Sequence, residues 1–190
     1  MGIKIIGFGK SPITLRVILT LQELVPVMID DGFTLYKSRA ICCYLVNKYQ
    51  GTKNSTILIP KDIQKAALVE QYLSVKNLYF EIPSTTINFE EIVAVKYMGK
   101  EANAEKVKEA KEKLEQTLDV YEKFLEGKDY LTGEYSLANI IHVPNLFANI
   151  HKTSAKYIYY DAKRPNVIKC VENLLETPTW KQITANLNSD

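Results

Sequence analysis

The stretch Val25-Pro26-Val27-Met28-Ile29-Asp30-Asp31-Gly32-Phe33-Thr34-Leu35-Tyr36-Lys37-Ser38-Arg39-Ala40 decides the fold of this 190-residue chain. Residues 27–29 predict a short buried strand. Asp30-Asp31-Gly32 predicts a tight hairpin turn, because an Asp-Gly pair supplies the positive φ that two-residue loops need. Residues 33–36 then form the return strand. Taken alone, this pattern also fits a generic hairpin followed by a packed helix, so the remaining sequence has to decide its meaning.

A helix follows the hairpin and begins at Ser38, whose hydroxyl can accept hydrogen bonds from the N–H groups of the first turn. Ile41, Tyr44 and Leu45 share one face of this helix at a spacing of 3.6 residues, with Lys48 at its solvent margin. We therefore expect Ser38 as the N-cap and one face of the helix packed.

Composition excludes several classes of protein. A hydrophobic share of 46% is enough for a sizeable core, and 190 residues suit one compact unit or two small subdomains. The net charge of +2 argues against general nucleic-acid binding, which needs clustered positive charge. No apolar run approaches the ~20 residues of a membrane span. The first residues lead straight into a strand-like segment, so we expect no signal peptide.

The cysteines and histidines indicate a reduced protein without a metal site. Cys42, Cys43 and Cys170 lack the spacing of metal ligands, which favours structural thiols in a cytoplasmic protein. His142 and His151 are too few and too scattered to hold a metal ion.

The order of the strand and helix patterns along the sequence predicts a small α/β part followed by an all-helical part. Residues 4–7 read as a strand, and Ser11-Pro12 reads as the start of a helix that reaches about Glu23. A loop rich in Gly, Thr, Asn and Ser follows Tyr49 and ends at Ile59-Pro60. We therefore expect one domain over residues 1–50 and a second over 60–190.

Helical patterns fill the second part. Asp62 caps a first helix, and residues 83–91 are irregular enough to kink or break it. Residues 104–126 carry an apolar stripe with Lys and Glu on the remaining faces. The stripe consists of Val107, Ala110, Leu114, Leu118, Tyr121 and Leu125. Further helices are expected from Ser136 to about His151, from Pro165 and from Pro178.

Four pieces of sequence, in order, resemble the cytosolic glutathione transferases, most closely the phi class of plants and fungi. The likeness extends over almost the whole chain. The pieces are residues 3–7 with 11–17, the quoted stretch 25–40, the capping box in 130–139, and the C-terminal pattern Pro165, Val167, Pro178, Trp180 and Lys181. Each piece is weak alone, and their order makes the resemblance strong.

The resemblance implies an α+β fold with a truncated thioredoxin-like N-terminal domain and an all-α C-terminal domain. It implies an enzyme of detoxification that joins glutathione, its co-substrate, to small hydrophobic electrophiles. It also implies a cytoplasmic homodimer, with no metal and with neither nucleic acid nor membrane as a partner.

The family's site residues carry over onto five positions. Ser11 would donate its hydroxyl to the glutathione thiolate at a helix N-terminus, which favours negative charge. The alternative is that Ser11 only caps its helix. Val25, before Pro26, would pair its backbone with the cysteinyl residue, and Ser38 would receive the γ-glutamyl carboxylate. Lys37 would lie beside the glutathione amine.

Three departures from the family pattern bear on activity. Lys37 stands where the family has an acidic residue, and like charges ~4 Å apart repel by ~1 kcal/mol in water. Asn139 replaces the aspartate of the capping box. Only Leu24 separates the first helix from Val25, where the family has a second strand and helix. We therefore expect a first helix that is shortened or frayed at its end, or a distorted sheet.

Two other functions compete with conjugation. Lys37 and the shortened N-terminal part favour a catalytically weakened module for ligand binding or protein assembly. The other competing function is a redox role for Cys42 or Cys43, as in relatives that act on mixed disulfides. These thiols lie beyond Ser38 and not at the position of Ser11, which argues against this role.

Overall fold

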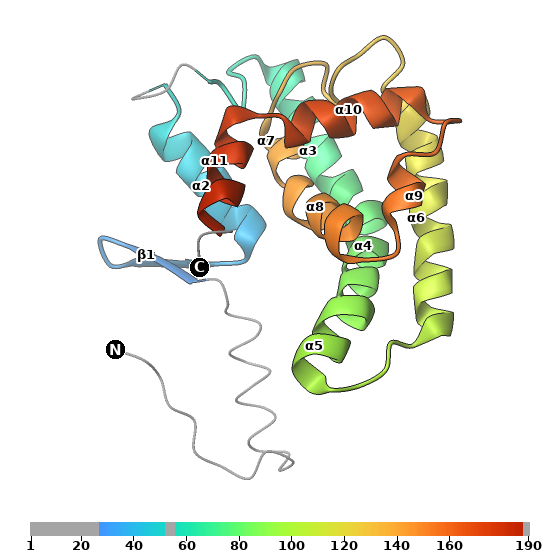
Figure 1. The fold of residues 1–190 in the computed structure, drawn as a ribbon. Helices are drawn as coiled ribbons and strands as arrows, with labels where there is room; N and C mark the ends of the chain where they lie inside the picture. Colours follow the sequence, from blue (N-terminus) through green and yellow to red (C-terminus); the bar gives the residue numbers. More distant parts are fainter. Residues whose placement is uncertain (1–26, 52–55, 188–190) are drawn as a thin grey trace. The chain divides into compact units, whose positions relative to one another are not determined.

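The computed structural model describes residues 27–51 and 56–187, and the chain divides into two compact units, Met1–Thr56 and Ile57–Asp190. Figure 1 shows the helices and strands of both units. In the described residues the first unit contains one hairpin and one helix, and the second is entirely helical. The architecture is therefore α+β, with the strands confined to the first unit.

The hairpin forms as the sequence predicts, but it is more exposed than expected. Strand β1 (Val27–Asp30) pairs antiparallel with β2 (Phe33–Tyr36), so that Val27 lies opposite Tyr36. Asp31 and Gly32 take φ values of 48° and 84°, the two positive values of a type I′ turn. The prediction that residues 27–29 are buried is wrong: Val27 is 46% and Ile29 72% exposed. Among the described residues β1 has only β2 as a strand partner, which leaves these side chains in solvent.

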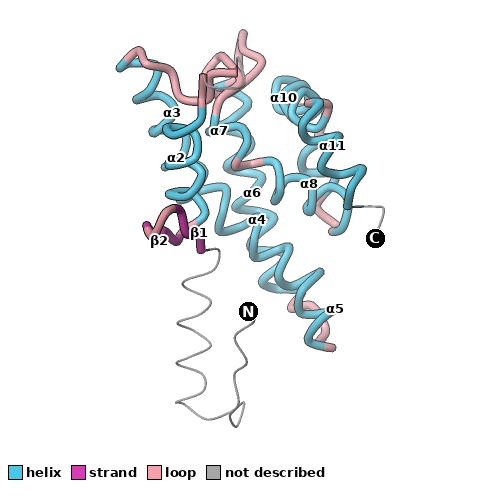
Figure 2. The backbone as a smooth tube through the Cα atoms, turned by 90° about the vertical axis from the view of Figure 1, so that its left-hand side faces the viewer, coloured by secondary structure: helices cyan, strands magenta, loops and turns pink. Residues whose placement is uncertain are grey.

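Helix α2 (Ser38–Tyr49) follows the hairpin and contacts β2 (Figure 2). The helix is predicted correctly, but Ser38 is not its N-cap. That position belongs to Lys37, and no side-chain hydrogen bond caps the helix there. The carbonyl of Lys37 accepts the first helical hydrogen bond from the Ile41 N–H, at 3.0 Å. Ser38 is therefore the first residue inside the helix.

A continuous helical segment opens the second unit and carries two π-helical turns. It consists of α3 (Ile63–Val75), η1 (Lys76–Phe80), α4 (Glu81–Asn88), η2 (Phe89–Ala94) and α5 (Val95–Met98). The Asp62 side chain caps α3 by accepting from the N–H groups of Gln64 and Lys65, as predicted.

Residues 83–91 do not break this segment, contrary to expectation. Pro83 has no N–H to donate and would clash with the carbonyl one turn earlier in a regular helix. The π-helical turn before α4 widens the helix at this point. The backbone therefore passes Pro83 without leaving the helical path.

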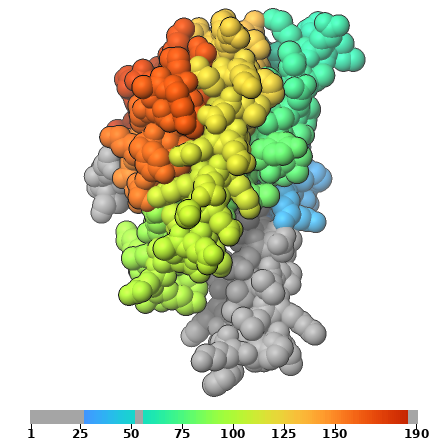
Figure 3. All heavy atoms as spheres, turned by 90° about the vertical axis from the view of Figure 1, so that its right-hand side faces the viewer, coloured from blue at the N-terminus to red at the C-terminus, as the bar shows by residue number. Residues whose placement is uncertain are grey.

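Helix α6 (Ala104–Phe124) packs against several helices of the second unit. It contacts α4 on one side and α9 (Lys156–Tyr159) and α10 (Pro165–Leu175) on the other (Figure 3). All six residues of its predicted apolar stripe are buried. Periodicity alone therefore identified the face of α6 that forms the core.

The helix expected from Ser136 to His151 is two helices, α7 (Leu137–Ile140) and α8 (Val143–Lys152). Ser136 is the N-cap of α7, and its N–H and hydroxyl both donate to the Asn139 side-chain oxygen at 3.0 Å. Asn139 therefore keeps the hydrogen bonds of a capping box. Helix α10 begins at Pro165, and α11 (Pro178–Leu187) begins at Pro178, both as predicted.

Candidate functional site

The turn that joins β2 to α2 holds its backbone in an unusual conformation. Lys37 has φ 70° and ψ 112°, outside the regions that residues other than glycine normally occupy. Such a conformation costs on the order of 1–3 kcal/mol and is found most often at functional sites. The turn is thus the feature of the first unit that best marks a binding site.

Two segments of the first unit meet at this turn. Val27, the first residue of β1, pairs with Tyr36, the residue directly before Lys37. The start of the strand and the start of helix α2 therefore lie at the same end of the hairpin. A ligand bound there could contact both the edge of a strand and the N-terminus of a helix.

The charges at the start of α2 favour an anionic group. The first turn of α2 contains no acidic residue, and Lys37 and Arg39 lie on either side of Ser38. A helix N-terminus carries a partial positive charge and directs N–H groups outward, so it can bind a carboxylate. Ser38 is exposed at this position.

A second cluster joins the tip of the hairpin to the middle of α2. Tyr44 donates its hydroxyl proton to the Asp30 carboxylate at 2.7 Å, and the Lys48 ammonium forms an ion pair with the same oxygen. The Tyr44 ring also packs on Phe33, with 5.5 Å between ring centroids. The hydrogen bonds from Lys48 and then Tyr44 lower the pKa of Asp30, and Asp30 in turn raises the pKa of Tyr44 and of Lys48.

The predicted site residues divide into two groups. Ser11, Val25 and Pro26 lie outside the described residues, as do the first helix and its expected fraying. Lys37 and Ser38 are adjacent at the head of α2, one at the N-cap and the other at the first helical position.

Sequence reasoning missed the Asp30 cluster. Tyr44 and Lys48 stand four residues apart and therefore share a helix face, but nothing local shows that Asp30 lies opposite them. The available signal was that Asp30 directly precedes the Asp-Gly turn, where a helix packed on the hairpin can reach it.

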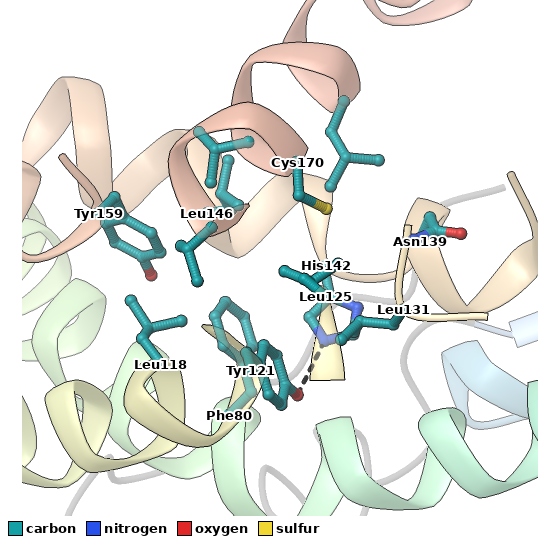
Figure 4. A pocket seen from close by; sticks show the side chains of 13 residues that line it. Phe80, Leu118, Tyr121, Leu125, Leu131, Asn139, His142, Leu146, Tyr159 and Cys170 are labelled. Atoms are coloured by element: carbon teal, nitrogen blue, oxygen red, sulfur yellow. Dashed lines mark hydrogen bonds between the residues drawn. The ribbon is translucent and has the colours of Figure 1, made fainter. Parts of the chain in front are cut away.

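The enclosed cavity of the second unit belongs to its core. It has a volume of about 30 Å³ and lies between α6, α8 and α10, with the Phe80 ring as part of its wall (Figure 4). His142 is buried at its wall, 3.2 Å from the Tyr121 hydroxyl, and a hydrogen bond of 2.6 Å joins its Nδ1 to the Ala138 carbonyl. Burial lowers the pKa of His142 to about 4 and raises that of the lining Cys170 thiol to about 12. The cavity holds no more than a water-sized molecule.

Two open grooves in the second unit are large enough for a small molecule. One, of about 320 Å³, is apolar and runs between η1 and α6, where Tyr79, Val120 and Phe124 line it. The other, of about 560 Å³, lies along α6 beside Tyr157 and is lined by both charged and apolar side chains. In this second groove the Lys111 ammonium lies 3.6 Å from a Glu91 carboxylate oxygen. Both grooves lie within the second unit.

Metal and membrane sites are not indicated by the described residues. Within residues 27–51 and 56–187, no cluster of three or more His, Cys, Asp or Glu side chains could hold a metal ion. Among the helices of this part of the chain, none is long and apolar enough to cross a bilayer.

Comparison with known proteins gives one consistent result. The family described as "Glutathione S-transferase, C-terminal domain" matches residues 85–178. The glutathione S-transferase hmp2 of Hypomyces subiculosus is 36% identical over 170 residues, covering 85% of this chain and 74% of the relative. Glutathione transferase F2 of Populus trichocarpa has a similar structure, with a TM-score of 0.81 and 25% identity over 95% of this chain and 82% of that one.

Two further relatives bear on the length and the ligands. A glutathione S-transferase of Hyoscyamus muticus is 29% identical over an alignment of 212 residues, covering 96% of this chain and 97% of the relative. Because that alignment is longer than this chain, the relative contains residues with no counterpart here. A glutathione S-transferase I from maize, solved with an atrazine glutathione conjugate, has a TM-score of 0.75 and 27% identity over 93% of this chain and 78% of that one.

These matches confirm the family and the fold that the sequence pieces indicated. The hairpin and α2 belong to the truncated thioredoxin-like part, and the helices after Ile57 form the all-α part. The identity to hmp2 and the likeness to the poplar enzyme both extend well beyond the C-terminal match. The chain therefore belongs to the glutathione S-transferase family and is similar to its phi class.

Proposed function

We propose that this protein conjugates the thiolate of glutathione to small hydrophobic electrophiles. The observation that carries the proposal is the Lys37–Ser38 turn, where a non-glycine residue with φ 70° is the N-cap of α2 and Ser38 is exposed. A strained turn at a helix N-terminus suits the binding of a peptide carboxylate. The atrazine glutathione conjugate bound by the maize relative supports a small organic electrophile as the second substrate.

The chemistry assigns a different task to each predicted residue. The hydroxyl of Ser11 donates to the thiolate and keeps it deprotonated near neutral pH, where the thiol itself is a poor nucleophile. The Val25 backbone, before Pro26, pairs with the cysteinyl residue, and Ser38 receives the γ-glutamyl carboxylate. The thiolate sulfur then attacks the electrophilic carbon, a C–S bond forms, and the leaving group departs with its electron pair. The thiol proton has already passed to solvent.

The proposal extends to organisation and location. We place glutathione binding in residues 1–50 and the pocket for the electrophile against the helices of residues 60–190.

We also propose that the protein is a cytoplasmic homodimer that acts in detoxification. Apolar side chains exposed on the second unit, such as Leu78, Tyr79 and Ile82, offer a surface for a second copy. Sedimentation at micromolar concentration should give twice the mass of one chain.

The test of the reaction is the Ser11→Ala variant. With an activated aryl chloride as electrophile, kcat/KM should fall about 100-fold, because one hydrogen-bond donor to a developing or stabilised anion is lost. Retention on a glutathione column should persist, since the γ-glutamyl and cysteinyl contacts remain. Full turnover by Ser11→Ala would remove Ser11 from the mechanism.

A non-catalytic ligand-binding or assembly module is the second candidate. Lys37 in place of an acidic residue and the residues absent relative to the Hyoscyamus protein favour it. It predicts a folded chain that yields no conjugate at any glutathione concentration. Saturable turnover by the wild-type protein would eliminate this candidate.

A further inference from the structure

The position of α2 depends on contacts outside any hydrophobic core. None of its twelve residues is buried, so within the described part of the first unit this helix has no apolar core to fix it. Its partner there is the hairpin, through β2 and through the Asp30 carboxylate. The contacts with Asp30 are therefore among those that orient α2 on the hairpin.

The Asp30 contacts form a clasp that consists of Asp30, Tyr44 and Lys48. Both partners of the carboxylate come from α2, one turn apart, and they meet the same Asp30 oxygen. The Lys48 ammonium also lies 5.7 Å from the centroid of the Tyr44 ring, where it adds a cation–π attraction. Because three groups bind one another, the clasp resists loss more than an isolated surface pair would.

The clasp lies at the opposite end of the hairpin from the strained turn. Asp30 pairs with Phe33 beside the hairpin tip, whereas Val27 pairs with Tyr36 next to Lys37. The helix is thus held at both ends: by the chain itself at Lys37 and by the clasp at Tyr44 and Lys48. A helix fixed at two separate points cannot pivot about its first residue.

We infer that Asp30, Tyr44 and Lys48 are positioning residues for glutathione, which hold α2 so that the Lys37–Ser38 turn meets the γ-glutamyl end of the ligand. This inference rests on the proposed function. When the clasp opens, only a fraction of molecules presents the turn correctly, and the apparent Kd rises by the inverse of that fraction. The chemical step at the thiol is unaffected once glutathione is bound.

The experiment compares Asp30→Asn and Tyr44→Phe with Asp31→Asn as a matched control. Asp31 is the neighbouring turn residue, has the same charge, and has a positive φ of 48° that asparagine also tolerates. Isothermal titration should show a Kd for glutathione raised about fivefold or more by Asp30→Asn and Tyr44→Phe, as expected for the loss of a charge-assisted hydrogen bond. Asp31→Asn should leave the Kd within about twofold of wild type, the scale of an exposed substitution away from contacts.

Three readouts separate positioning from simple loss of folding. The kcat at saturating glutathione should stay near the wild-type value, and the binding stoichiometry should stay the same, whereas partial unfolding would lower both. The double variant Asp30→Asn/Tyr44→Phe should raise the Kd by less than the product of the two single effects, because both substitutions act on the same Asp30 carboxylate. Equal Kd values for Asp30→Asn and Asp31→Asn would overturn the inference.

Failure of the proposed function would be visible separately, as a wild-type protein that does not bind glutathione. In that event, hydrogen exchange at the Ile41 amide tests whether the clasp fixes the start of α2, because this amide donates to the Lys37 carbonyl there. Faster exchange in Asp30→Asn than in Asp31→Asn would keep the clasp as the device that fixes α2. Identical exchange in the two variants would overturn it.

Discussion

At the scale of single residues, Lys37 is the most informative position in the chain. Its backbone lies where a functional turn is expected, but its charge is the reverse of the acidic residue that the resembled family has there. The backbone conformation and the side chain therefore give opposite indications about glutathione binding. Substitution of the side chain alone separates the two.

We expect Lys37→Glu to tighten glutathione binding. A carboxylate would attract the ligand's amine where the ammonium repels it, and two such changes of ~1 kcal/mol amount to about tenfold or more in Kd. Lys37→Gln should give an intermediate Kd, because it removes the repulsion without adding an attraction. Titration of the three proteins at low salt provides the measurement, and weaker binding by Lys37→Glu than by Lys37→Gln would contradict the assignment.

The second prediction for a single residue is that His142 makes the stability of the folded chain depend on pH. Burial lowers its folded-state pKa to about 4, below the value of about 6.5 expected in the unfolded chain. Between these values the unfolded chain binds a proton that the folded chain does not, so stability is complete above about pH 6.5 and is lost as the pH falls. At pH 5 the loss amounts to about 2 kcal/mol.

The measurement is the free energy of unfolding in urea at pH 7.5 and pH 5. A non-titrating His142→Gln variant should lose less stability across this range than wild type does, by the same ~2 kcal/mol. His151→Gln, which changes the exposed histidine of α8, should keep the wild-type pH dependence. An unchanged slope in His142→Gln would show that other groups cause the acid sensitivity.

At the scale of elements, the capping box of α7 carries a clear prediction. Asn139 is 1% exposed, and its side-chain oxygen accepts both the N–H and the hydroxyl of Ser136. Asn139→Ala leaves the buried Ser136 N–H without this partner, while the Ser136 hydroxyl keeps the Thr132 hydroxyl at 3.1 Å, and should cost about 1–3 kcal/mol. Asn47→Ala on α2 is the control, since its hydrogen bond of 2.9 Å to the Cys43 carbonyl is exposed and its loss should cost less than about 0.5 kcal/mol. Equal shifts of the urea midpoint would contradict the buried role of Asn139.

Elements with local signals were predicted from sequence, and elements shaped by contacts were not. The Asp-Gly turn, the Asp62 cap, the stripe on α6 and the start of α10 all follow from residues a few positions apart. The division between α7 and α8 and the π-helical turn before Pro83 depend on packing between distant segments. Short sequence patterns do not show which distant segments pack together, so the sequence did not predict these features.

The candidate site shows the same limit. The helix start after the hairpin is visible in the sequence, and the family resemblance supplied Lys37 and Ser38 as site residues, but the exact N-cap was wrong by one residue. That error arises because the strained backbone of Lys37, and not a side-chain cap, begins the helix. The clasp joins residues 14 and 18 positions apart, a separation that a single sequence cannot resolve.

At the scale of the whole molecule, the two units differ in how they are stabilised. The second unit contains a continuous apolar core, whereas none of the described residues 27–51 is buried. Within the described residues, the free energy of folding therefore comes mainly from the helices after Ile57, since buried apolar area is the dominant favourable term. This difference fits a first unit that lacks a strand and a helix relative to the family pattern.

We therefore expect residues 57–190 alone to fold cooperatively and to keep most of the stability of the full chain. Circular dichroism during urea unfolding should give midpoints that agree closely between the fragment and the full chain.

The Leu114→Ala substitution tests the same point in both the fragment and the full chain, because this side chain on α6 is fully buried and its truncation costs about 2–5 kcal/mol. If the core is self-contained, the same loss must appear in both backgrounds, as independent sites add. A fragment that unfolds without a transition, or a Leu114→Ala cost that differs by more than about 1 kcal/mol between backgrounds, would mean that the first unit supplies part of the core.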